Sequence, residues 1–182
     1  MQFKTVDLVK YGMEKVWATM RDDLSKLAEM MEDIESITET ERIESPPVVH
    51  LVNIWKSALK FPQSIKMIIG SETLVWTDRG DWNNETHICE WTIDFLNLQD
   101  SVDCRGTTVF EPALGGKGTK ITFSGNLEWN SQKLAGIAGF FGETVMLMAE
   151  DIIDHAIQKN FRKIADTTGK YLAPSHQKDQ KK

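Results

Sequence analysis

Strand-like segments separated by short turns fill most of this chain and constrain its fold more than any other feature. Their residues alternate between apolar and polar or are rich in β-branched types. The six segments between residues 34 and 129 are 34–44, 48–59, 73–82, 85–96, 101–112 and 117–129. Turn-forming residues such as Ser-Pro-Pro at 45–47 and Gly-Gly-Lys-Gly at 115–118 separate them. Because links this short join antiparallel neighbours, the sequence predicts an antiparallel sheet.

The alternation also predicts which side of the sheet is buried. In segment 85–96, one face carries His87, Cys89, Trp91, Ile93 and Phe95, whereas the other carries Glu90, Thr92 and Asp94. Segment 117–129 alternates in the same way. A sheet with one apolar and one polar face packs its apolar face against another layer.

Helical periodicity appears at both ends of the chain. A strand at Gln2–Val9 precedes two short periodic runs, Met13–Met20 and Leu24–Met31, and Asp22 or Asp23 can cap the second. Residues 131–168 are also helical in pattern, but one straight helix of that length would measure about 57 Å against roughly 40 Å for the domain. Glycines at 136, 139 and 142 supply a break, which leaves Glu143–Thr168 as the main helix.

Three further segments need separate interpretation. Residues 61–70 fit either a short helix or a loop, with Pro62 at a helix start. The apolar run from Leu134 to Ala149 is a weak membrane-span candidate, because Glu143 and Thr144 interrupt it. We therefore expect no integral membrane segment. The third segment, residues 173–182, is polar and is expected to be a disordered tail after one domain over 1–172.

Composition narrows the choice of partners. The net charge is −6, and no basic stripe with interleaved aromatic residues occurs, so we expect no nucleic-acid binding. The chain opens without a leader-like pattern, which favours the cytoplasm. Cys89 and Cys104 lack metal-ligand spacing and are expected to be reduced, half-buried thiols. The four histidines are also too scattered for a metal site, and we expect no metal and no cofactor.

Three short motifs stand out in the chain. They are Glu14-Lys15-Val16-Trp17 followed by Asp22 or Asp23, residues 31–37, and residues 118–125. They resemble, in that order, the first helix, the turn into strand two and the last strand of the START and birch-pollen-allergen-like superfamily, which includes polyketide cyclase/dehydrase and lipid-transport families. The resemblance spans about residues 1–170. It implies an α+β helix-grip fold, in which a seven-stranded curved antiparallel sheet wraps around a long C-terminal helix, with two short helices between strands one and two.

The resemblance also implies an elongated apolar cavity between the sheet and the last helix, which would hold a hydrophobic small molecule such as a lipid, polyketide or quinone. Aromatic residues suit the walls of such a cavity. On the helix, the 4-3-4 spacing predicts one buried stripe. The predicted cavity residues are Trp76, His87, Trp91, Ile93 and Phe123 on the sheet, and Phe141, Val145, Met148 and Ile152 on the helix.

Three functions stay open at this point. The first is a binding or carrier protein, the second an enzyme of cyclase, dehydratase or hydrolase type, and the third an interaction module. No nucleophile elbow or phosphate loop occurs, so we assign no catalytic residue; an enzyme would need a titratable group on the inner face, for which His87 is the best candidate. The interaction module, including a homodimer, would use Ile137, Phe140, Phe141 and Leu147 as an exposed patch.

Overall fold

A computed structural model describes residues 1–58, 60, 63, 66, 72–96, 102–130 and 143–174; within 143–158, the only side chains it describes are those of Leu147 and Ile157. The elements follow the predicted order. They are β1 (Gln2–Val9), α1 (Met13–Asp22), α2 (Leu24–Ala28), β2 (Ile34–Ser45), β3 (Val48–Ser57), β4 (Val75–Asn83), β5 (Ile88–Phe95), β6 (Val102–Ala113), the short 3₁₀ turn η1 (Leu114–Gly116), β7 (Gly118–Trp129) and α5 (Glu143–Tyr171). Three segments lie wholly or mostly outside the described residues. They are 61–70, which fits either a helix or a loop, the glycine-rich stretch 134–142, and the tail from 175 onward.

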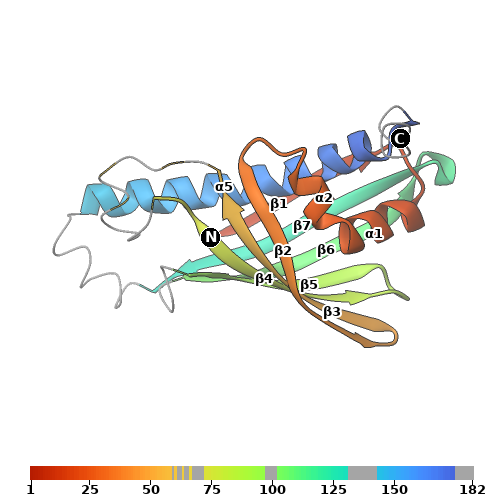
Figure 1. Cartoon of the computed structure of the whole chain (residues 1–182), viewed down its shortest axis with the longest axis horizontal. Coiled ribbons are helices and arrows are strands. Elements are labelled where there is room, and N and C mark those ends of the chain that lie inside the picture. Colours follow the sequence, from red (N-terminus) through yellow and green to blue (C-terminus); the bar gives the residue numbers. More distant parts are fainter. Residues whose placement is uncertain are drawn as a thin grey trace.

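The strands form one seven-stranded sheet in the order β1-β7-β6-β5-β4-β3-β2, and every neighbouring pair is antiparallel. From β2 to β7 each strand lies beside the next one in the chain. By contrast, β1 pairs with β7, so β1 and β2 occupy opposite edges of the sheet. Helices α1 and α2 connect these two edges (Figure 1). The predicted α+β class and seven-stranded antiparallel sheet are confirmed.

The long helix α5 lies along one face of the sheet and runs beside β1 (Figure 1). Phe161 attaches it there, because its ring stacks on Phe123 with centroids 4.7 Å apart and lies 5.0 Å from the ring of Trp91. A third ring, that of Phe3 on β1, lies 6.0 Å away. Ring contacts of this kind add to the apolar burial that holds the helix on the sheet.

Two ion pairs join the far edge of the sheet to the same helix. Asp33, just before β2, pairs with Lys159 at 2.8 Å and also with Lys163. Hydrogen bonds from both lysines lower the pKa of the Asp33 carboxyl group. The helix is thus connected both to β1 and to the start of β2, the two strands at the sheet edges.

Burial follows the predicted alternation in β5, where Cys89, Trp91, Ile93 and Phe95 are buried and the residues between them are exposed. Neither cysteine forms a disulfide bond, and both are buried more deeply than the half-buried state expected from the sequence. Among the helices that the structure describes, none is long and apolar enough to cross a membrane.

Candidate functional site

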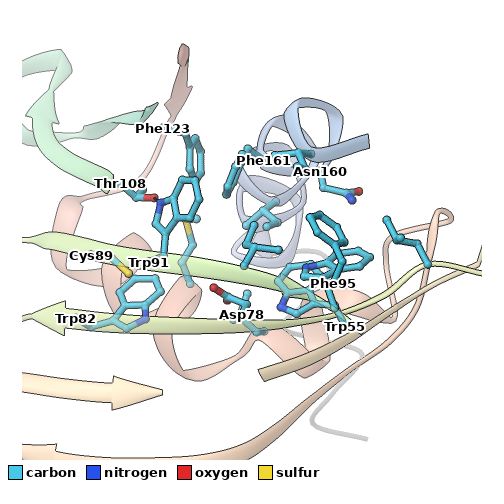
Figure 2. Close-up of a pocket in the computed structure, with 17 residues that line it drawn as sticks. Trp55, Asp78, Trp82, Cys89, Trp91, Phe95, Thr108, Phe123, Asn160 and Phe161 are labelled. Carbon is cyan, nitrogen blue, oxygen red and sulfur yellow. Dashed lines mark hydrogen bonds between the residues drawn. The ribbon is translucent and has the colours of Figure 1, made fainter. Parts of the chain in front are cut away.

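A cavity lies between the sheet and α5. It offers about 70 Å³ to the centres of water-sized molecules, several times the ~10–15 Å³ that one water needs on the same measure. Most of its wall is aromatic or aliphatic. The described lining comprises Met20, Leu24, Trp55, Leu74, Trp76, Asp78, Trp82, Cys89, Trp91, Ile93, Phe95, Thr108, Phe123, Ile157, Asn160, Phe161 and Ile164 (Figure 2). The space can therefore hold several waters or an apolar group in their place.

Four of the five sheet residues that the sequence suggested lie in this lining. They are Trp76 on β4, Trp91 and Ile93 on β5, and Phe123 on β7. The ring of Trp91 lies over Gly106 and Gly125, which face each other across β6 and β7. A Cβ atom added to Gly125 would lie 2.6 Å from the Trp91 ring, so the absence of a side chain there makes room for this wall.

His87 is placed differently from the prediction: it is not among the lining residues. Its backbone has a φ of 53°, in the left-handed region, and β5 begins one residue later at Ile88. The alternation that puts Cys89 and Trp91 on the inner face therefore does not extend back to His87. Its Nε2 atom lies 3.0 Å from the Glu14 carboxylate, and its ring packs against Trp17.

The helical part of the prediction falls largely on undescribed side chains. Phe141 lies outside the described residues, and Val145, Met148 and Ile152 belong to α5 without described side chains. The described cavity residues of the helix are Ile157, Asn160, Phe161 and Ile164. Ile157, Phe161 and Ile164, together with the buried Thr168, have the same 4-3-4 spacing as the predicted stripe but lie sixteen residues farther along the chain.

The lining also contains a carboxyl group that is not among the predicted cavity residues. Asp78 lies on β4 between Trp76 and Gly80 on the inner face, and its side chain points from the strand into the cavity (Figure 2). Burial among apolar groups raises the pKa of Asp78 to about 7, whereas the Trp55 N–H and the positive charge of Arg79 act in the opposite direction. The period-2 pattern of Trp76, Asp78, Gly80 and Trp82 is the sequence signal that could have identified it.

Two of the indole N–H groups near the cavity have side-chain acceptors, and a third has none. Trp91 Nε1 donates to Thr108 Oγ1 at 3.1 Å, and Trp17 Nε1 donates to Asn84 Oδ1 at 3.0 Å. Trp55 is only 4% exposed, and its Nε1 has no hydrogen-bond partner among the described residues. It is close enough to Asp78 to favour the ionised carboxylate, but it does not reach hydrogen-bond geometry.

The described cavity lining contains few other groups that could bind a metal or transfer a proton. Cys89 is the second titratable group of the described lining, and burial raises the pKa of its thiol well above the ordinary value, so that it stays protonated. Among the described residues, no cluster of three or more His, Cys, Asp or Glu side chains could hold a metal ion. His50 lies outside the lining, with its Nδ1 atom 2.6 Å from Asp81.

The patch suggested for protein interaction is only partly described. Leu147 on α5 is 63% exposed, whereas Ile137, Phe140 and Phe141 lie outside the described residues. The homodimer and the interaction module therefore stay predictions.

No protein-family model matches the chain, and no curated protein matches its sequence. Solved structures do share its fold. The Zhui aromatase/cyclase from Streptomyces sp. R1128 matches with a TM-score of 0.66 at 13% identity, over 96% of this chain and 97% of that one. Ara h 8.0201 matches with a TM-score of 0.62 at 16% identity, over 94% and 96% of the two chains. The protein TTHA0849 from Thermus thermophilus matches with a TM-score of 0.60 at 13% identity, over 95% and 100%.

At identities this low, the structural matches establish a common fold and nothing more. The chain therefore has the helix-grip fold of the birch-pollen-allergen-like proteins, as the sequence resemblance implied. Its function has to be argued from its own residues.

Proposed function

We propose that this protein binds a hydrophobic small molecule, such as a lipid, polyketide or quinone, in the cavity between the sheet and α5. The observation that carries the proposal is the cavity wall, in which rings from the sheet and from the helix face a common space. Binding there would bury apolar ligand surface against Trp55, Trp76, Trp91 and Phe161, and such burial is the main favourable term in pocket binding. The cytoplasmic location expected from the sequence stays a prediction.

A cavity-filling variant tests the proposal with a neutral probe, N-phenyl-1-naphthylamine, whose fluorescence rises in apolar surroundings. Ile157 lies in the lining on α5, and Ile157→Trp would place a larger ring in the space. We expect this variant to lose at least tenfold in affinity for the probe. Val6→Trp, at an exposed position on β1, is the matched control and should bind like the wild type.

Circular dichroism would establish that both variants are folded. Equal probe binding by wild type and folded Ile157→Trp would place the probe elsewhere and contradict the proposal.

A second candidate is an enzyme of cyclase or dehydratase type that acts on such a ligand. Asp78 favours it, because a carboxyl group with a pKa near neutrality, facing an apolar cavity, suits proton transfer. The name of one structural neighbour, an aromatase/cyclase, points the same way. Asp78 here takes the role for which His87 was the best candidate in the sequence.

Elimination of water from 4-hydroxy-4-phenylbutan-2-one tests this candidate. The C–O bond breaks, a proton leaves the carbon beside the ketone, and the products are water and a conjugated enone that is followed by its absorbance. Catalysis by the wild type that is lost in Asp78→Asn would support the enzyme. No acceleration over buffer by a wild type that takes up this ketone would favour the binding protein.

A further inference from the structure

Asp78 occupies a position where uncharged groups surround it on the cavity side. Across the sheet, its direct partners are Asn53 on β3 and Ile93 on β5. Its neighbours on the inner face of β4 are Trp76 and Gly80. From the helices, the described lining is Met20 on α1, Leu24 on α2, and Ile157, Asn160, Phe161 and Ile164 on α5. None of these side chains carries a charge.

The charged and titratable groups near Asp78 do not supply a counter-ion inside the cavity. Arg79, next along β4, points to the other face of the sheet, where it pairs with Asp94. Cys89 is the other titratable group of the described lining and is held in its neutral form. Two further cations, Lys159 and Lys163 on α5, pair with Asp33. The cavity therefore favours the protonated acid, which is a hydrogen-bond donor.

The indole N–H of Trp55 is a second donor beside this acid. It is buried, lines the cavity, and has no acceptor within the described protein. A buried N–H without a partner is unfavourable, and such groups in native structures call for an explanation. A ligand atom that accepts hydrogen bonds would supply one.

We propose that Asp78 and Trp55 form a two-donor site for the carbonyl oxygen of a ketone-bearing hydrophobic ligand. This inference rests on the proposed function and specifies its ligand class. A carbonyl oxygen has two lone pairs and accepts from the Asp78 O–H and the Trp55 N–H at once. An ammonium group, by contrast, would pair with an ionised Asp78 and has no acceptor to offer the Trp55 N–H.

Three probes of one size separate these possibilities: acetophenone, ethylbenzene and 1-phenylethylamine. They share a phenyl ring and a two-carbon substituent and differ only in carrying a carbonyl, no polar group or an amine. Titrations followed by the indole N–H resonances in nuclear magnetic resonance spectra give each affinity, and Trp55→Phe assigns the Trp55 signal. At pH 5.5, we expect acetophenone to bind about tenfold more tightly than ethylbenzene and to shift the Trp55 N–H signal downfield.

The pH dependence has a definite sign. As the pH rises from 5.5 to 8.5, Asp78 ionises and loses its donor hydrogen, so the preference for acetophenone over ethylbenzene should shrink. Asp78→Asn retains an N–H donor that does not titrate, and the preference should become independent of pH. Trp55→Phe keeps an aromatic ring, and it should reduce the preference without weakening ethylbenzene binding.

Two outcomes would overturn the proposal while leaving a hydrophobic pocket intact. One is equal affinity for acetophenone and ethylbenzene at pH 5.5. The other is strongest binding of 1-phenylethylamine, increasing with pH, which would make Asp78 an anionic partner for amines. Failure of ethylbenzene itself to bind would contradict the proposed function, and this inference with it.

Discussion

Replacing Asp78 by asparagine removes a titratable group from the cavity and should stabilise the protein at alkaline pH relative to the wild type. The pKa of this carboxyl group is raised to about 7 by burial, whereas an aspartate in the unfolded chain titrates near ~3.9. Because the folded state holds the proton more tightly, the free energy of unfolding of the wild type falls as pH rises from about 4 to about 7, and the lost stability stays lost above that. The amide of Asp78→Asn undergoes no such change.

Urea unfolding at pH 5 and pH 8 measures the effect. Asp78→Asn should gain stability over the wild type between these pH values by up to about 2.7 kcal/mol, because about two pH units lie between pH 5 and the pKa of Asp78. Glu90→Gln, exposed on the outer face of β5, is the control and should show no comparable gain. A pH-independent difference between Asp78→Asn and wild type would contradict the raised pKa.

Gly125 and Gly169 differ in the space that each leaves for an added Cβ atom. A Cβ atom at Gly125 would lie 2.6 Å from the Trp91 ring and 2.7 Å from the Phe3 ring, whereas at Gly169 on α5 the nearest neighbour would be 3.8 Å away. Gly125→Ala should therefore cost about 1–3 kcal/mol through overpacking. Gly169→Ala should gain about 0.5–1 kcal/mol, because alanine is the better helix former. Thermal unfolding of both variants tests the contrast, and a neutral Gly125→Ala would show that Trp91 moves aside freely.

At the scale of elements, Phe161 is the side chain that joins α5 to three strands. Its ring contacts those of Phe3 on β1, Trp91 on β5 and Phe123 on β7. Because the ring is only half-buried, Phe161→Ala should cost about 2–3 kcal/mol, less than the ~3–5 kcal/mol of a fully buried phenylalanine. Arg162→Ala, at the exposed neighbouring position, is the control for helix propensity. Denaturant unfolding that gives the two variants equal stability would contradict this role of Phe161.

The elements themselves could be predicted well because their periodicity is a local property. Alternation fixed the inner face of β5 from Cys89 onward, and its failure at His87 came from a single left-handed residue before the strand. A period-2 pattern in the sequence does not reveal such a change in the backbone angle φ. The helix stripe was read from residues 141–152, although Phe161, farther along, makes the described ring contacts with the sheet.

The cavity chemistry was harder to predict, because it depends on which side chains meet in three dimensions. Asp78 is one acid among 27 acidic residues, and its significance arises from the rings packed around it. The unpartnered N–H of Trp55 likewise follows from packing across β3 and β4, which no spacing in the sequence encodes. The sequence resemblance indicated that a cavity should exist but did not indicate its polar groups.

At the scale of the whole molecule, one arrangement explains the core and the site together. The strand order puts β1 and β2 at opposite edges of the sheet. Helix α5 contacts β1, while its lysines reach the residue before β2. The helix thereby closes the space above β4 and β5, where the aromatic wall and Asp78 lie. The stability of the fold and the proposed ligand binding thus rest on the same interface.

Native mass spectrometry of the purified protein, combined with solvent extraction, tests whether the cavity holds an apolar ligand. We expect either a mass above that of the bare chain, with an extractable apolar molecule to match, or uptake of one member of a panel of lipids, quinones and polyketides. The Ile157→Trp variant should lose this bound mass. A bare mass for the wild type, with no uptake from any member of the panel, would contradict binding of a hydrophobic ligand in the cavity.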